Sequence, residues 1–292
     1  ERKLESAQLL LTQYFVAFLT GNENELRRTV TAARKSPATE DIISHIEALA
    51  LARSGQLQDA RRMAAVAVQI AQKSGPRERA GLFEAATAVW EAFYGNATAA
   101  RQSAARALEL GKGGREVDYA AAFALALAGD LPQSRALAQE LAREFPEDTS
   151  VQFMYLPTLR ALFSLNTPTP DAAAAIQALQ TASRYDLAIG GVGYVGRFGG
   201  LYPIYVRGLA YLAARQPAEA AAEFQRILDH RSMVLVDPMD AMARLQLARA
   251  LVLSGDTVKA KSAYNDLLTL WKNADPDIRV LMEAQVEYAR LP

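Results

Sequence analysis

Apolar and small residues recur along the chain in steps of three and four positions, and short polar turns interrupt them at intervals. The stretch ALALARSGQLQDARRMAAVAVQIA at 48–71 shows this pattern on both sides of Gly55. Steps of three and four place these residues on one face of a helix. Glycine readily adopts the positive φ with which many helices end. The stretch therefore predicts two amphipathic helices joined by a tight turn.

This two-helix pattern repeats along the chain. The equivalent turn positions are Gly21, Gly55, Gly95, Gly129, Arg215 and Gly255. Where two copies adjoin, their turns lie 34 or 40 residues apart. A period of 34 residues resembles the tetratricopeptide repeat, a helix–turn–helix unit, and a spacing of 40 fits the same unit with six inserted residues.

The repeats predict the fold class. We expect an all-α, right-handed superhelix (an α-solenoid) of about seven tetratricopeptide-like units. A weaker copy at 149–185 is the fifth unit, with Asn166 to Pro170 as its turn. A last helix from about Asp277 to Arg290 would cap the exposed face of the final unit.

Residues 190–200 break the pattern, because six of these eleven residues are glycine. A helix cannot persist there, so we expect a loop or hinge at 186–200. It would separate N-terminal units at 1–185 from C-terminal units and the capping helix at 201–292.

The same segment contains a literal G-x-G-x-x-G motif at Gly191, Gly193 and Gly196. A phosphate-binding loop of this type follows a strand and opens a helix. Here RYDLAI precedes the motif, RFGGLYP follows it, and alternating strand patterns are lacking. The hinge interpretation is therefore favoured over phosphate binding, while Arg197 and Phe198 leave open a loop that contacts a partner.

Composition narrows the possible chemistry. Alanine supplies 57 of the 292 residues, which favours helices over strands. The absence of cysteine excludes disulfides, thiolate metal sites and cysteine nucleophiles, and two histidines are too few for a multi-histidine metal site. Lys plus Arg and Asp plus Glu are 32 each, so no net charge attracts nucleic acid. We expect no cofactor, no direct nucleic-acid contact and no membrane insertion by this segment.

Partner-binding candidates follow from the first helix of each unit, which would line a concave groove. They are Phe15, His45, Arg53, Tyr119, Tyr205 and Arg249. Two of them have a structural alternative that is favoured. His45, among Ile42, Ile46 and Leu49, reads as a partly buried helix residue, and Tyr205 reads as part of the core between repeats.

The second half resembles a more specific group of proteins. The strings DTSVQFMYLPTLRA, LYPIYVRGLAYLAARQPAEAAAEFQRILDHR and ARLQLARALVLSGDTVKAKSAYNDLLTLWKNADPDI are similar to the C-terminal tetratricopeptide regions of large bacterial signalling proteins, especially those of acidobacteria. In those proteins the region follows a serine/threonine kinase domain or a winged-helix DNA-binding domain. The resemblance covers about residues 140–290. It implies scaffolding or regulatory work with no catalytic residues in this segment, and one of these domains upstream in the parent chain.

Two functions are consistent with these observations. The leading hypothesis is a non-catalytic module that binds a protein or peptide partner in its groove. The alternative is a ligand-sensing domain whose two parts close about the Gly-rich hinge. An enzyme is disfavoured, because the motifs VAIK, HRD and DFG are missing and the candidate phosphate motif lacks its context. Because the chain starts at Glu1 with no signal segment, we expect a soluble piece of a longer protein, with no indication of its compartment.

Overall fold

The structure is a computed structural model and describes residues 7–74, 77–188 and 198–292. Over these residues it contains sixteen α-helices and no strand. The helices are α1 (Ala7–Thr20), α2 (Glu23–Arg34), α3 (Glu40–Arg53), α4 (Leu57–Ser74), α5 (Arg77–Phe93), α6 (Ala97–Gly111), α7 (Arg115–Leu127), α8 (Leu131–Glu144), α9 (Leu156–Leu165), α10 (Ala172–Gln180), α11 (Leu201–Ala213), α12 (Pro217–Asp229), α13 (Arg231–Val234), α14 (Met239–Leu253), α15 (Thr257–Leu270) and α16 (Arg279–Ala289). A π-helical turn (Val151–Tyr155) leads into α9, and a 3-10 turn (Ala182–Tyr185) follows α10.

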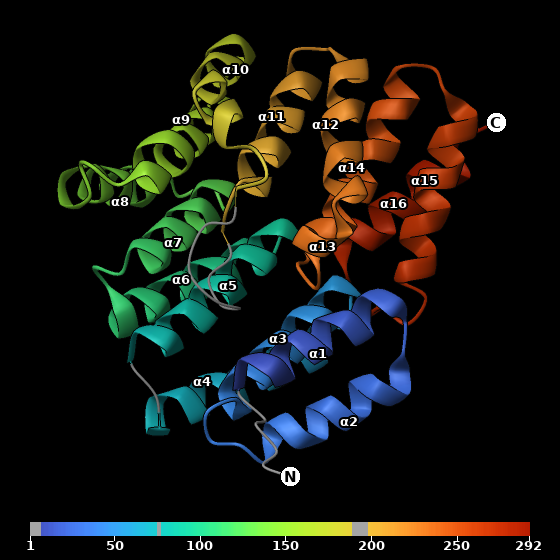
Figure 1. The fold of residues 1–292 in the computed structure, drawn as a ribbon. Coiled ribbons are helices and arrows are strands. Elements are labelled where there is room, and N and C mark those ends of the chain that lie inside the picture. The colour runs from blue at the N-terminus through green and yellow to red at the C-terminus, as the bar shows by residue number, and fades with distance from the viewer. Residues whose placement is uncertain (1–6, 75–76, 189–197) are drawn as a thin grey trace.

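Most of these helices form antiparallel pairs that stack side by side (Figure 1). The seven pairs are α1/α2, α3/α4, α5/α6, α7/α8, α9/α10, α11/α12 and α14/α15, with α16 after the last pair. The predicted all-α superhelix of seven tetratricopeptide-like units and a C-terminal helix is confirmed. The short helix α13 is additional to this scheme.

The turn positions found in the sequence end the first helix of six of these pairs. The glycines among them all have positive φ, between 67° and 82°. Arg215 takes φ 58° at the equivalent position, although side chains disfavour this region. The carboxylates of Asp130 and Asp256 then accept hydrogen bonds from the third amide of the following helix, at 3.3 and 3.1 Å. The turns predicted from spacing are thus confirmed, with N-caps as the sequence suggested.

The first helices form the core and the second helices cover it. In α7 every residue from Val117 to Ala126 is buried, whereas α6 buries only Ala100, Ser103, Ala104 and Ala107. Small residues let the layers approach closely. A Cβ on Gly208 of α11 would lie 2.6 Å from the ring of Phe224 on α12, so this position requires glycine.

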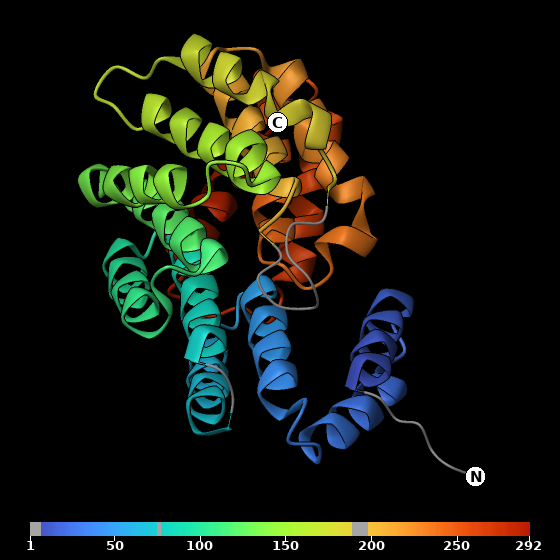
Figure 2. The ribbon, with the colours of Figure 1, turned by 60° about the vertical axis from the view of Figure 1, so that its left-hand side comes forward.

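The stack of units curves until its last pair meets its second pair. In both views the C-terminal helices lie beside α3 and α5, and α14 contacts both (Figures 1 and 2). The indole Nε1 of Trp271 donates to the Arg53 carbonyl at 2.9 Å, and the amide of Asp275 donates to the Gly55 carbonyl at 3.0 Å. The Asp275 carboxylate in turn accepts from the amide of Gln58 at 2.8 Å. We call these five residues the closure contact.

Because of this closure, the inner face of the superhelix is filled with side chains and does not form an open groove. One hydrophobic core runs from Ala52 to Ala284, and it includes residues on both sides of the Gly-rich segment. Helix α11 also packs directly on α9 and α10. The division into 1–185, 186–200 and 201–292 therefore stays a prediction, since no boundary in the core marks it.

Candidate binding site

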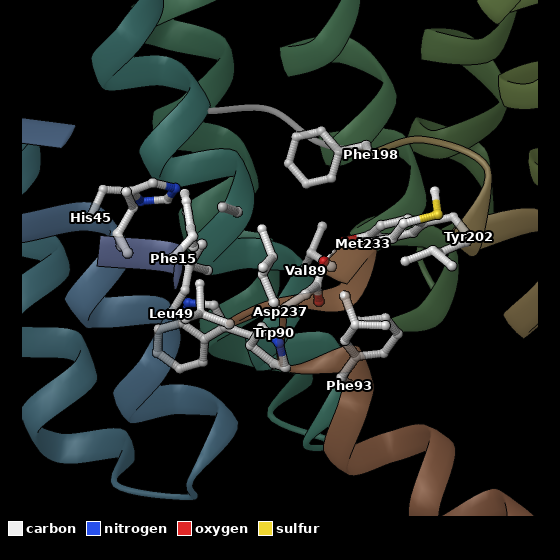
Figure 3. Close-up of a pocket in the computed structure, with 17 residues that line it drawn as sticks. Phe15, His45, Leu49, Val89, Trp90, Phe93, Phe198, Tyr202, Met233 and Asp237 are labelled. Atoms are coloured by element: carbon white, nitrogen blue, oxygen red, sulfur yellow. Dashed lines mark hydrogen bonds between the residues drawn. The ribbon is translucent and has the colours of Figure 1, made fainter. Parts of the chain in front are cut away.

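A cavity of about 60 Å³ lies on the inner side of the superhelix, where helices distant in sequence converge. Figure 3 shows its walls. They come from α1, α3 and α5, from the start of α11 with the preceding Phe198, and from residues 233–238. The walls are mainly apolar and include the rings of Phe15, Trp90, Phe93 and Tyr202. An apolar cavity with few polar groups is the usual form of a binding site.

The wall at 233–238 belongs to the segment between α12 and α14, which inserts toward the centre of the molecule. Leu235 and Val236 pack with Phe15 of α1 and Ile46 of α3 in a small separate core. Leu235 has φ 51°, a region that a branched side chain rarely adopts. The contacts with α1 and α3 hold the residue there. The insertion thus brings the carboxyl group of Asp237 into the cavity wall.

Asp237 is the acidic group of this wall. One carboxylate oxygen accepts from the amide of Met239 at 2.8 Å, and the other accepts from the Tyr202 hydroxyl at 3.2 Å. Burial raises the pKa of Asp237 to about 6, although both hydrogen bonds oppose this rise. The negative charge of Asp240 raises it further. The cavity therefore holds a carboxyl group whose charge is poorly compensated.

His45 lines the opposite side of the cavity from α3 (Figure 3). Its imidazole stacks on Phe83 of α5, with ring centroids 4.3 Å apart and planes 15° from parallel. Burial lowers the pKa of His45 to about 3, so the ring is neutral at ordinary pH. The favoured interpretation from sequence, a buried helix histidine, matches this placement.

The neutral state of His45 gives a testable pH dependence. The folded protein leaves His45 unprotonated where the unfolded chain, with a pKa of 6.5, binds a proton. Its contribution to stability is therefore complete above this value and is lost as pH falls toward 3. Relative to His45→Phe, which keeps the stacking, we expect the wild type to lose about 2 kcal/mol more between pH 7 and 5. Urea unfolding at both pH values measures this difference.

The comparison of the two proteins isolates His45. Burial also raises the pKa values of Asp118 and Asp237 to about 6, which acts in the opposite direction over the same range. These carboxyl groups are present in both proteins and cancel in the difference. Parallel pH curves for wild type and His45→Phe would contradict the buried neutral imidazole.

The other groove candidates lie elsewhere. Tyr119 and Tyr205 are buried in the core, where Tyr119 stacks on Tyr155 at 3.8 Å between ring centroids. This differs from the expected lining of an accessible groove. The reason is that α7 and α11 are apolar on nearly all sides, so they must be covered all round. Any contact of these rings with a partner remains a prediction.

The two arginine candidates hold the fold together. Arg53 pairs with Asp240 of α14 at 2.7 Å and lies over the ring of Phe18. Arg249 binds Glu287 of α16 through two hydrogen bonds of 2.9 and 2.7 Å. Both side chains are partly buried in these pairs, which accounts for their positions on the first helices without a partner.

The Gly-rich candidates are only partly within the described residues. Gly191, Gly193, Gly196 and Arg197 lie outside them. Phe198 is described, and it is buried against Tyr202 with ring centroids 5.7 Å apart. Together with Phe15 and His45, it is one of three sequence candidates that line the cavity.

Sequence reasoning missed the most polar part of the site. Asp237 and its neighbours in 233–238 were not among the candidates, although the spacing contained a signal. The 40 residues from Arg215 to Gly255 indicate six inserted residues, and the insertion is the segment that carries Asp237. In the other unit of this spacing, the extra length goes into the long helices α4 and α5.

The described residues contain no group of three or more metal-binding side chains, and none of their helices is long and apolar enough to span a bilayer. No family model and no curated protein matches the sequence. Among solved structures, the chain is similar to the crystal structure of the yeast Tom70, with a TM-score of 0.46 and 12% sequence identity. The similarity covers 99% of this chain and 55% of that one, so the chain spans about half the length of this relative.

Proposed function

We propose that this chain is a non-catalytic interaction module that binds a protein or peptide partner at the inner cavity. The observation that supports this proposal is the convergence of α1, α3, α5, α11 and the inserted segment 233–238 on one apolar space. Inner faces are where repeat arrays of stacked helices hold their partners. Here closure leaves room for a side chain in place of a whole helix.

The chemistry of the wall supports binding rather than catalysis. Its aromatic rings supply apolar contact area at low cost in side-chain entropy, as in many recognition sites. His45 is stacked on Phe83 and neutral, so its ring has a packing role. Asp237 already accepts two hydrogen bonds from the protein, which fix its orientation for recognition.

Filling the cavity tests this proposal. Ala86 of α5 lines the cavity, and Ala86→Leu would occupy part of its volume. We expect peptides selected by display on the wild type to bind this variant about tenfold more weakly, equivalent to about 1.4 kcal/mol. Isothermal titration calorimetry gives the affinities.

The matched control is Ala105→Leu, because Ala105 is exposed on the outer helix α6. This variant should bind the selected peptides like the wild type. Equal binding by Ala86→Leu would show that the peptides bind elsewhere and would remove the cavity from the proposal. Thermal unfolding of both variants checks that the substitution in the cavity leaves the fold intact.

A second candidate is a ligand-sensing domain, and one observation favours it. Phe198, Leu201 and Tyr202 follow the Gly-rich segment, yet they share the cavity with α3 and α5. A small molecule in the cavity would contact both parts of the array and could bias their relative position. A thermal-shift screen against metabolites separates the candidates, because only the sensor predicts a specific shift of several degrees by a small molecule.

We also propose that the module belongs to a longer bacterial signalling protein. The support is the resemblance of residues 140–290 to regions that follow kinase or winged-helix domains. The coding sequence upstream of Glu1 tests it directly. A kinase or winged-helix domain there is the expected result, and an unrelated domain would contradict the proposed parent.

A further inference from the structure

Asp237 lacks a cation among the described residues, although arginines lie close by. Its neighbour Asp240 pairs with Arg53 at 2.7 Å and with Arg244 at 3.2 Å. Asp237 itself is recorded only with the neutral donors Met239 and Tyr202. A carboxylate in an apolar wall is costly unless a cation or a proton compensates its charge.

Aromatic rings surround the same space. Tyr202 lies 6.4 Å from Phe93 and 5.7 Å from Phe198 between ring centroids, and all three line the cavity. Trp90 lines it from the side of α5 (Figure 3). Aromatic faces attract ammonium groups, and more strongly where water is excluded. The rings and the carboxylate therefore favour the same kind of ligand, an organic cation.

The size of the cavity limits this cation. A volume of about 60 Å³ has room for on the order of four to six water-sized groups. The side chain of lysine, with four methylene groups and one nitrogen, is of this size.

Hydrogen-bond geometry distinguishes lysine from arginine. A guanidinium binds a carboxylate best through two parallel hydrogen bonds, one to each oxygen. Both oxygens of Asp237 already accept from the protein, at Met239 and at Tyr202. An ammonium group needs only one remaining acceptor position, so it fits where the planar fork does not.

We propose that the cavity takes a lysine side chain of the partner, with its ammonium group on Asp237 and its aliphatic stem against Phe93, Phe198 and Tyr202. This inference rests on the proposed function and adds the chemistry of the group that is recognised. It specifies a partner with an exposed lysine at the point of contact.

The test uses three blocked tripeptides that differ only in the central side chain. They are acetyl-Gly-Lys-Gly-amide and its norleucine and arginine counterparts, and binding is followed by NMR titration of the full chain. Norleucine keeps the aliphatic stem and removes the charge. We expect the lysine peptide to bind at least about tenfold more tightly than either of the others.

The variant Asp237→Asn should remove the preference for lysine over norleucine. The control Asp171→Asn makes the same chemical change at the N-cap of α10, where asparagine caps equally well, and should keep the preference. If Asp237→Asn does not fold, the pH dependence of the wild type replaces it. The affinity for the lysine peptide should then fall between pH 7.5 and 5, as Asp237 gains a proton.

The groups that face Asp237 permit this pH test. Tyr94 and Tyr202 remain protonated over this range because burial raises their pKa values well above 10, and His45 remains neutral because burial lowers its pKa to about 3. Asp240 is held by its two arginines. Within this set, Asp237 is the group that changes charge.

Three results would overturn the inference. They are equal binding of the lysine and norleucine peptides, an unchanged preference in Asp237→Asn, and tight binding of n-butylammonium without binding of the lysine peptide. The last result would assign the cavity to a free amine. None of them decides the proposed function, which is tested separately by display-selected peptides and Ala86→Leu.

Discussion

Replacing Trp271 with alanine is expected to lower the free energy of unfolding by about 3–5 kcal/mol and to part the two ends of the array. The indole is buried, and it packs edge-on against Tyr94 at 5.5 Å between ring centroids. Its Nε1 is also the donor to the Arg53 carbonyl in the closure contact. The substitution removes apolar burial, a ring contact and a hydrogen bond together.

Small-angle X-ray scattering and urea unfolding measure the two effects of Trp271→Ala. The matched control is Trp90→Ala, because Trp90 is equally buried but lies outside the closure contact. Both variants should lose similar stability, while only Trp271→Ala should increase the radius of gyration. An unchanged radius in Trp271→Ala would mean that the other closure contacts hold the ends together without the indole.

Replacing Arg207 with methionine is the second change with a large expected effect. The guanidinium of Arg207 on α11 is buried and binds Asp186 and Glu223, each through two hydrogen bonds, the shortest of 2.7 Å. Asp186 would keep only Arg226, and Glu223 would lose both hydrogen bonds. Breaking a buried ion pair on one side leaves an uncompensated charge, so we expect a loss of about 3–5 kcal/mol in the free energy of unfolding.

A second variant separates charge from shape at this site. In Arg207→Met/Asp186→Asn the stranded carboxylate becomes neutral, so part of the lost stability should return. The control Arg62→Met removes an exposed arginine and should change stability by no more than about 0.5 kcal/mol. Urea denaturation of the four proteins gives the coupling. A loss below about 1 kcal/mol for Arg207→Met would show that water replaces the guanidinium at little cost.

The local structure could be predicted from the sequence because it depends on neighbours in the chain. The turn glycines have positive φ where the spacing predicts helix ends, and Arg215 follows them at the position of a missing glycine. Asp130 and Asp256 cap the helices that they precede. Each of these features is decided within a few residues, where propensity and hydrogen bonding act directly.

Closure could not be predicted in the same way. It joins Arg53 to Trp271, which are 218 residues apart, and its geometry sums the small rotation between every pair of units. The sequence nevertheless contained a signal against an open groove. The run YAAAFALAL at 119–127 is apolar on every face, which is typical of a helix that is covered all round.

The binding site combines both cases. Phe15 and His45 were found because they lie on first helices at the expected helical spacing. Asp237 was missed because it belongs to an insertion, and a repeat pattern says nothing about where an insertion folds. Its position is decided by Leu235 and Val236, which are buried against α1 and α3.

The closure contact restricts how this protein can change in evolution. An open array tolerates the gain or loss of a unit, because each unit touches only its neighbours. In this chain one more helix pair between α5 and α12 would carry Trp271 past Arg53, and one fewer would stop it short. The number of repeats is therefore fixed by the circumference of the molecule, and homologues that keep Trp271 and Arg53 should also keep their repeat count.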